Sequence, residues 1–459
     1  MSHAMTRGLA MAIAVAPFLI ACGGGKADNP GPVTPAQCSG ASCGPQGAPT
    51  PSATTATLCP DTADIVKSTY LGGAGSGEIV QLNIDATAMT YTLKWLESPI
   101  PLTSASVSVT RKGTQITGAV IHPPTGMLPT AEQTRCAFIL GAGTGTASDG
   151  TTYTTPDFVN NPNPPMILIG KGVAGGGIPG ATIQYAGVSL GVTTLGAVNK
   201  RHFDFYPFLG FASTTTDITK LPGTYNALLY HLSPTANYET VATNSVETFD
   251  ASGNCTSSSS TGCLSTGNAL TLNSNGYFDS TNPPQIVPST GASSNPFRTG
   301  NYGTAHMILG QLNGATVPLV VRTGYVDTSN LLTAKVDDES GIAMLAAATP
   351  LASGGFDGGY VGADSNFKYT ATLVQGAAAT FINPSTSAAE SSVGLSYGAS
   401  SPGLVNVQDS TGNTGLAIAS GGLYATVIQG EENGGITSTS ANTDTPSAPY
   451  FGIGAQISK

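Results

Sequence analysis

The chain carries two copies of a serine pattern that can support covalent chemistry. Gly187-Val-Ser189-Leu-Gly191 and Gly394-Leu-Ser396-Tyr-Gly398 both match Gly-x-Ser-x-Gly. In hydrolases this pattern places a serine nucleophile on a tight turn between a strand and a helix. So much glycine and serine produces about 0.7 matches by chance, and neither match is followed by a good helix start. We therefore assign no catalytic residue and keep a serine hydrolase, acting through Ser189 or Ser396, as an alternative.

An aromatic stretch supplies the second candidate site. It runs from His202 to Phe211 and contains His202, Asp204 and Tyr206. A few convergent polar groups in an apolar pocket are typical of ligand sites, so these three residues form a candidate pocket. A run this rich in aromatic side chains is more often buried core or the seam between two sheets. We expect core here, with the pocket as the alternative.

The N-terminal residues have the order of a secretory signal peptide. Arg7 precedes a short apolar run that ends in Leu19-Ile20-Ala21-Cys22. The run is shorter than the roughly 20 residues that a spanning helix needs, and small residues before a cut are typical of signal peptides. Leu19-Ile20-Ala21-Cys22 resembles the lipobox of bacterial lipoproteins. The resemblance implies cleavage before Cys22, acylation of its thiol and firm anchoring in a lipid membrane.

The residues after the cysteine bear on localisation. Gly23 rather than Asp follows Cys22, and by analogy with bacterial lipoproteins this favours the outer membrane of a Gram-negative cell envelope. The stretch up to residue 58 is rich in Gly, Pro, Ala, Ser and Thr and holds almost no large apolar residue. Such a composition cannot bury a core. We expect a signal peptide at 1–21 and a disordered, lipidated tether at 22–58.

The cysteine count is compatible with an oxidising compartment. If Cys22 carries lipid, six cysteines remain, an even number that permits disulfides. The candidates are Cys38, Cys43, Cys59, Cys136, Cys255 and Cys263. Proximity along the chain predicts the pairs Cys38–Cys43 and Cys255–Cys263, which leaves Cys59 with Cys136. No pair has the two-residue spacing of a zinc knuckle and no histidine lies near them, so we expect neither a metal site nor a cofactor.

Composition excludes several classes of partner. Charged residues make up 9% of the chain, against about 25% in typical proteins. The 16 Lys and Arg residues are scattered along the sequence, so no basic stripe is available to neutralise nucleic-acid phosphates. The surface must consist largely of hydroxyl and amide groups. We expect no nucleic-acid partner, and leave a surface ligand or protein unidentified.

From Cys59 onward the pattern is that of β-strands. The segments 90–96 and 105–110 alternate apolar and polar residues, and 166–169 is a short apolar run after two prolines. Such runs, separated by turn signals such as Asn275-Gly276, predict a mainly β protein with little helix. Only Asp337 to Ala348, acidic at its start and then rich in alanine, favours a helix. We expect one large or two smaller antiparallel domains, sandwich-like or barrel-like, at 59–215 and 216–459.

A faint internal repeat accompanies the β pattern. Ser68-Thr-Tyr70-Leu-Gly-Gly, Leu221-Pro-Gly-Thr-Tyr225 and Gly355-Phe-Asp-Gly-Gly-Tyr360 each place a glycine near an aromatic residue at the start of a block. This indicates a strand unit that is used again, with glycine at bends and tyrosine covering the core. The glycine-rich, tyrosine-punctuated pattern resembles proteobacterial lipoproteins with an uncharacterised β domain. The resemblance implies no known activity.

Together these features predict a membrane-anchored lipoprotein outside the cytoplasm that acts in binding or in structure. Catalysis is not expected, although the serine hydrolase stays as one alternative. A second alternative is an outer-membrane β-barrel, which the length permits. Regular strands of about ten residues flanked by aromatic girdles are hard to find in the sequence, however.

Overall fold

The computed structural model describes residues 59–458, apart from 104–105, 129–130, 162–163, 186, 190–193, 196, 257–269, 282, 288–296, 365–368, 383–388, 411 and 429–449. Nearly all regular structure in these residues is antiparallel strand, which confirms the mainly β prediction. No helix in the described residues is both long and apolar enough to cross a lipid bilayer. The predicted signal peptide and tether, including Cys22, lie outside the described residues.

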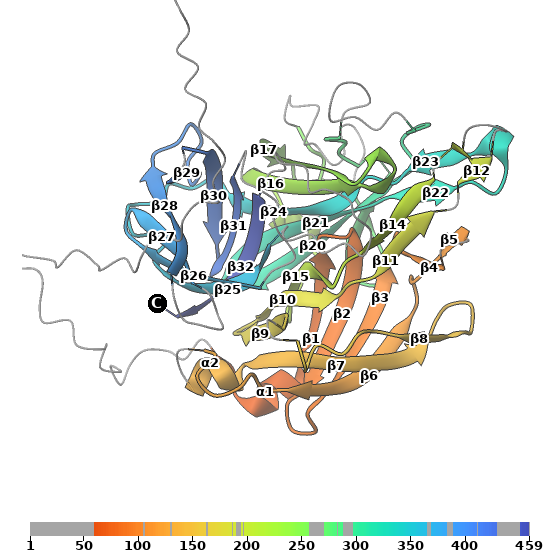
Figure 1. Cartoon of the computed structure of the whole chain (residues 1–459). Helices are drawn as coiled ribbons and strands as arrows, with labels where there is room; N and C mark the ends of the chain where they lie inside the picture. The colour runs from red at the N-terminus through yellow and green to blue at the C-terminus, as the bar shows by residue number, and fades with distance from the viewer. Residues whose placement is uncertain are drawn as a thin grey trace, which may run out of the picture.

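The first body is a closed eight-stranded barrel, drawn in orange to yellow in Figure 1. Its strands, in spatial order, are β6 (Gln115–Ile121), β3 (Thr90–Glu97), β2 (Glu78–Asp85), β1 (Thr69–Ala74), β15 (Phe205–Phe211), β10 (Val173–Pro179), β9 (Met166–Gly170) and β7 (Ala137–Thr146). Pairing of β6 with β7 closes the barrel, and the short β8 (Thr152–Thr154) pairs with β7.

Alternation along the strands fills this barrel. In β3, Tyr91, Leu93 and Trp95 are buried, each at most 1% exposed, because side chains in a strand point to opposite faces with a period of two. Two glycines make room for the Tyr91 ring. A Cβ atom at Gly118 would lie 2.6 Å from its Cε1 atom, and one at Gly143 would lie 2.4 Å from its hydroxyl oxygen.

The second body is an open seven-stranded sheet, green to teal in Figure 1. Its order is β17 (Glu239–Phe249), β16 (Gly223–Ser233), β24 (Ser340–Ala347), β21 (Ala315–Thr323), β20 (Thr304–Leu312), β19 (Phe278–Ser280) and β18 (Thr271–Leu272). We call it the central sheet, because its strands contact both barrels: β21 contacts β1, and β16 contacts β30.

The third body is a closed barrel of eight strands, coloured blue. Each strand pairs with its sequence neighbour, in the order β25 (Gly358–Asp364), β26 (Tyr369–Gln375), β27 (Ala378–Ile382), β28 (Ala389–Tyr397), β29 (Val405–Asp409), β30 (Thr414–Ser420), β31 (Leu423–Ile428) and β32 (Tyr450–Ser458). Pairing of β32 with β25 closes this second barrel.

Short elements complete the described structure. Four two-stranded sheets are formed by β4 (Pro101–Thr103) with β5 (Ser106–Thr110), β11 (Thr182–Tyr185) with β14 (Val198–His202), β12 (Val188–Ser189) with β13 (Thr194–Leu195), and β22 (Tyr325–Asp327) with β23 (Lys335–Asp337). The helical segments are α1 (Thr62–Lys67), α2 (Ala131–Arg135) and the 3₁₀ turns Ile218–Lys220, Pro234–Ala236 and Leu331–Thr333. The sequence analysis did not predict α1 or α2.

One apolar cluster joins the three bodies. Phe211 of β15, Ile308 of β20 and Phe451 of β32 belong to the same buried cluster. The Phe451 ring stacks on that of Tyr230 in β16, with centroids 5.4 Å apart. At about 25 cal/mol per Å² of buried apolar surface, such shared packing stabilises the three bodies as one unit.

The faint repeat in the sequence corresponds to a recurring local structure. In two of its three copies a glycine with positive φ opens a strand, at Gly223 (φ 148°) and Gly358 (φ 151°). The tyrosine two residues later donates its hydroxyl hydrogen bond to the carbonyl four residues before it. Tyr225 bonds to Leu221 at 2.9 Å, and Tyr360 to Phe356 at 3.0 Å. The repeat is thus a strand-opening device, since only glycine adopts this φ without strain.

The predicted helix from Asp337 to Ala348 is wrong. Its residues form the end of β23 and the whole of β24, which pairs with β16 and β21 in the middle of the central sheet. Gly341 lies against the backbone of Tyr230, where a Cβ atom would come within 2.1 Å of the carbonyl oxygen. The alanines are small residues at a crowded sheet position, and tertiary packing overrides their helix propensity.

Candidate functional site

A groove of about 570 Å³ lies between the edge strand of the central sheet and the second barrel. Thr243 and Asn244 of β17 form one side, and residues of β28 to β31 form the other. The full lining is Thr243, Asn244, Gly394, Leu395, Ser396, Asn406, Val407, Gln408, Thr414, Gly415, Leu416 and Val427. Its size is within the range of small-molecule and short-polymer sites.

Strand alternation and register place the polar side chains on the groove side. Ser396 of β28 pairs directly with Asn406 of β29, and all three of Ser396, Asn406 and Gln408 are exposed. The intervening Leu395 and Val407 are buried in the barrel's interior cluster. Gly394 pairs with Gln408 and adds no side chain, which leaves the groove open at that position.

The groove is lined by neutral side chains, many of which can form hydrogen bonds. Its described lining consists of hydroxyl, amide and apolar groups and contains no titratable side chain. General acid–base catalysis requires a titratable group within hydrogen-bond reach of the substrate, and the lining offers none. Hydroxyls and amides each both donate and accept hydrogen bonds, so the groove matches an uncharged ligand rich in such groups. No cluster of three or more His, Cys, Asp or Glu side chains suited to a metal occurs in the described residues.

The next described element after each of the two serine motifs is a strand rather than a helix. Ser396 lies within β28 and the next element is the strand β29, so no strand-to-helix turn carries it. Ser189 ends the two-residue strand β12, where it pairs with Thr194 of β13. The elbow geometry that gives the motif its chemical meaning is therefore missing at Ser396, and the element that follows Ser189 is a strand.

The three residues of the predicted pocket point to different surroundings. His202 and Asp204 form a partly exposed pair, with Nε2 and Oδ1 3.2 Å apart. Thr182 lies 2.9 Å from the other ring nitrogen of His202. Tyr206 is 1% exposed and packs against Phe203, 5.4 Å between ring centroids. Most of this aromatic stretch is core, so the three side chains do not converge on one ligand.

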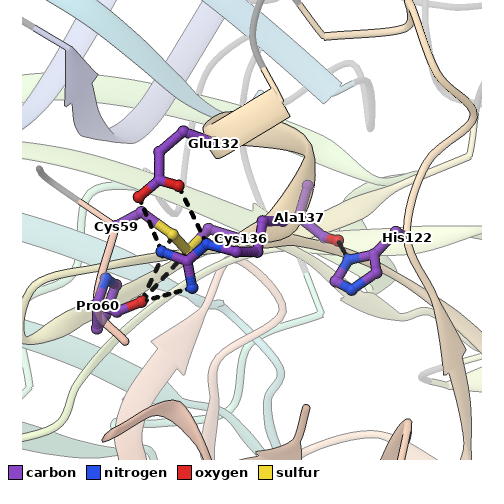
Figure 2. Close-up of a disulfide and its surroundings, with 7 residues drawn as sticks. Cys59, Pro60, His122, Glu132, Cys136 and Ala137 are labelled. Carbon is purple, nitrogen blue, oxygen red and sulfur yellow. Dashed lines mark hydrogen bonds and ion pairs between the residues drawn. A yellow bond between two sulfur atoms is a disulfide. The ribbon is translucent and has the colours of Figure 1, made fainter. Parts of the chain in front are cut away.

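A disulfide joins Cys59, the first described residue, to Cys136, which directly precedes β7 of the first barrel (Figure 2). Their Cα atoms are 6.0 Å apart, and the predicted pairing is present. Arg135 supports the joint, donating from Nη1 to the Pro60 carbonyl at 2.9 Å and pairing with Glu132 at 2.8 Å. Cys255 also takes part in a disulfide. The other predicted partners, Cys38, Cys43 and Cys263, lie outside the described residues.

The sequence analysis missed a buried ionic network in the central sheet. Asp337 and Glu339, both 0% exposed, are joined to Arg322 and Arg298, with Arg322 Nη2 donating to Asp337 at 2.8 Å. Asp337 also accepts from the backbone nitrogens of Tyr302 and Gly303, at 2.8 and 2.7 Å. The network therefore ties the chain around residues 302–303 to the sheet. The only signal in the sequence was a run of three acidic residues in a charge-poor chain.

Electrostatics keep the Glu339 carboxyl group of this network ionised. Burial by itself raises the pKa of Glu339, but the hydrogen bond with His231, 2.7 Å away, and the positive charges of Arg322 and Arg298 lower the pKa to about 2. Burial lowers the pKa of His231. These groups are surrounded by protein and are hydrogen-bonded to one another, which is the arrangement of a structural network.

A second buried pair lies in the first barrel. Glu78 of β2 and Arg111 are both 0% exposed and form an ion pair. Ser76 donates to Glu78 at 2.7 Å. Arg111 also lies over the Trp95 ring, 4.5 Å from its centroid, and donates to the Gly180 carbonyl at 3.1 Å. With these partners the charges are compensated, so the pair holds strands together rather than facing a ligand.

One family model matches most of the chain. The family model described as a protein of unknown function, DUF2957, matches residues 90–455, which include most of the first barrel, the central sheet and nearly all of the second barrel. No curated protein matches the chain. Because the match covers well over half of the 459 residues, the chain belongs to the DUF2957 family of proteins of unknown function.

Proposed function

We propose that this DUF2957 protein is a lipid-anchored binding protein of the bacterial cell envelope, held in the outer membrane through Cys22, and that the groove between β17 and the second barrel is its ligand site. The observation that carries the binding role is the groove's chemistry. Hydroxyl and amide side chains surround an apolar floor formed in part by Leu416 and Val427, and no described lining residue is titratable.

The lipobox residues support the anchoring. Leu19-Ile20-Ala21-Cys22 ends an apolar run that is too short to span a bilayer. A chain reaches at most about 3.3–3.6 Å per residue, so the residues from Cys22 to Cys59 allow up to roughly 120 Å between membrane and barrel. Several acyl chains at one site give stable attachment, whereas one chain holds a protein only weakly.

The anchor is tested by intact mass and membrane partition in a Gram-negative host. Wild type is expected to carry added acyl mass and to fractionate with the outer membrane, and Cys22→Ala to lose both properties. Gly23→Asp serves as the control, because it keeps the acylated cysteine and is expected to shift the protein toward the inner membrane. Wild type that is soluble and unacylated would overturn the anchoring. Heat-modifiable migration on a gel would instead support the outer-membrane barrel alternative.

The groove is tested by a thermal-shift screen of uncharged oligosaccharides and capped peptides. Ligands of the groove are expected to raise the melting temperature of wild type and of Gln115→Ala, which removes an exposed amide in the first barrel. They should not do so for the double variant Asn406→Ala/Gln408→Ala. Hits retained by the double variant would place binding elsewhere. Labelling of Ser396 or Ser189 by a fluorophosphonate probe, lost on substitution to alanine, would contradict the non-catalytic proposal.

A further inference from the structure

The tip of the β22–β23 hairpin presents a leucine directly to solvent. Leu332 is 93% exposed, whereas the next most exposed large apolar side chain among the described residues, Leu272, is 50% exposed. Isolated apolar side chains on a surface are ordinary. A leucine at the apex of a projecting turn, with nearly its whole side chain in water, is a different case, because the local structure holds it there.

Hydrogen bonds within the turn fix its shape. The Asn330 side chain accepts from the backbone nitrogen of Leu332 at 2.9 Å, and the Asp327 side chain accepts from that of Ser329 at 3.0 Å. The Thr333 nitrogen donates to the Asn330 carbonyl at 3.3 Å. The apex is therefore pre-organised, so little conformational entropy is lost when it engages a second surface.

The base of the hairpin is firmly packed on the protein. Val336 and Val326, 0% and 8% exposed, belong to the cluster that fills the first barrel. Thr299 forms hydrogen bonds with the backbone of Val336 in β23 and with the carbonyl group of Ala334. In Figure 1 the hairpin lies at the upper right, on the opposite side of the view from the blue barrel. The apex thus stands on a rigid support.

The types of side chain from the apex toward the base of the hairpin follow the order found across a membrane interface. The turn from residue 328 to 334 contains no charged side chain. Tyr325 and Tyr302 follow, 45% and 37% exposed, and the Lys335 ammonium lies 5.4 Å from the Tyr302 ring centroid. Aliphatic residues enter the acyl region, tyrosine occupies the headgroup level, and lysine reaches lipid phosphates.

We propose that this apex is a second membrane contact, in which Leu332 inserts into the lipid surface while Tyr325, Tyr302 and Lys335 lie at the headgroups. A convex apex can bind either a matching cavity in a partner or a fluid surface that adapts to it. A lipid surface also explains why an aliphatic side chain lies at the tip and aromatic and cationic side chains lie behind it. The contact goes beyond the anchor at Cys22. It sets which side of the protein faces the membrane.

The first test is partition onto vesicles of phosphatidylethanolamine and phosphatidylglycerol, using the full chain with Cys22→Ala so that no acyl group contributes. Leu332→Ser is expected to lower the partition coefficient about tenfold, the loss expected when one leucine no longer enters the apolar phase. Leu272→Ser, which removes the other well-exposed leucine, is the matched control and should leave partition unchanged. Both variants should keep the wild-type melting temperature, since neither side chain is buried.

A second measurement tests the insertion of Leu332 even if the protein without an acyl group binds vesicles only weakly. The Cys22→Ala chain with an N-terminal hexahistidine tag is held on vesicles that contain nickel-chelating lipid, which makes the test independent of acylation. Leu332→Trp emission should move to the blue and be quenched by brominated acyl chains. Leu272→Trp and the native Trp95, which is 0% exposed, should not respond. Equal partition of the two serine variants together with an unquenched Leu332→Trp signal would overturn the proposal, including the case in which the apex docks on a protein.

Discussion

The two barrels close with the same number of strands but by different routes. In the first barrel, β1 pairs with β15, so that Leu71 lies opposite Phe211 and distant parts of the chain must meet. In the second barrel every strand pairs with its neighbour in sequence, except for the final closure of β32 on β25. Non-local pairing is costly in loop-closure entropy. The first barrel accordingly contains additional restraints between its strands.

Those restraints are covalent and ionic. The first barrel has the Cys59–Cys136 disulfide and the buried pair of Glu78 with Arg111. The described interior cluster of the second barrel consists of apolar and tyrosine side chains, among them Tyr360 and Tyr424 at 5.1 Å between ring centroids. The comparison teaches that the barrel with non-local pairing is cross-linked, whereas the described interior cluster of the barrel with local pairing is held by side-chain packing.

The largest effect is expected from breaking the ion pair of the first barrel. Glu78→Gln leaves Arg111 charged, buried and without its carboxylate, which should lower the free energy of unfolding by about 4 kcal/mol. The matched change in the second barrel is Thr372→Val, which removes a hydroxyl 3.3 Å from that of Tyr424 and should cost about 1 kcal/mol or less. Urea unfolding followed by circular dichroism and by Trp95 fluorescence measures both. Equal costs would remove the distinction between the barrels.

Removal of the disulfide should rank second. Cys59→Ala/Cys136→Ala releases a loop with a sequence separation of 77, and we expect about 3 kcal/mol of lost stability, somewhat below the chain-entropy value of roughly 4.5 kcal/mol. Hydrogen exchange read by mass spectrometry should accelerate in β1 to β7 and stay unchanged in β26 to β31. Acceleration spread evenly over both barrels would show that they do not differ in their dependence on cross-links.

The third prediction uses pH to separate the central sheet from the second barrel. Burial raises the pKa of Glu247 in β17 from 4.5 to about 7, and the carboxyl group accepts from Ser245 at 2.8 Å. A raised pKa means that the folded state holds the proton more tightly. The contribution of protonated Glu247 to the free energy of unfolding is complete below the unfolded-state pKa of 4.5 and is lost as pH rises through about 7.

Between pH 5 and pH 8 the free energy of unfolding of wild type should therefore fall by about 2 kcal/mol relative to Glu247→Gln, which cannot ionise. Denaturant titrations at the two pH values give the difference. Hydrogen exchange, corrected for the intrinsic pH dependence of amides, should register the loss in β16 and β17 rather than in β26 to β31. A pH profile that is identical in wild type and variant would contradict the assignment to Glu247.

The smallest effect tests a feature that the two regions share. Tyr225→Phe and Tyr360→Phe each delete the hydroxyl that bonds to a carbonyl four residues earlier, at the opening of the central sheet and of the second barrel. Because the local geometry is the same, each should cost about 1 kcal/mol. A large inequality between the two would show that surrounding packing, rather than the repeated turn, determines the contribution.

Local patterns in the sequence predicted the strands well. The alternation through Tyr91, Leu93 and Trp95 is visible without a structure, and it is where β3 lies. The strand-opening glycine and the tyrosine are likewise only two positions apart in the sequence. The pairing of Cys59 with Cys136 followed once nearer cysteines had been paired along the chain. In each case the prediction depends on residues close together in the sequence or on a small set of candidate residues.

The remaining features depend on contacts that no local pattern contains. Asp337 and Glu339 were interpreted as the acidic start of a helix. Their ion-pair partners, Arg298 and Arg322, lie too far away in the sequence for a local pattern to reveal them. The groove likewise combines Asn244 with Gln408, which are ordinary surface amides until the central sheet and second barrel meet. The Gly-x-Ser-x-Gly matches are a local pattern that carries little information in this chain. Glycine and serine are so frequent here that the pattern alone does not specify an elbow.

The position of the disulfide has a mechanical consequence. A pull on the chain ahead of Cys59 passes through the sulfur bridge to Cys136 and enters the molecule at the start of β7. The covalent loop between the two cysteines, which contains β1 to β6, carries none of that tension. Covalent bonds, rather than the hydrogen bonds of β1, take the load. If the N-terminal end is anchored as proposed, movement of the membrane would load this bridge first, and the strands would resist separation for as long as the bridge stays oxidised.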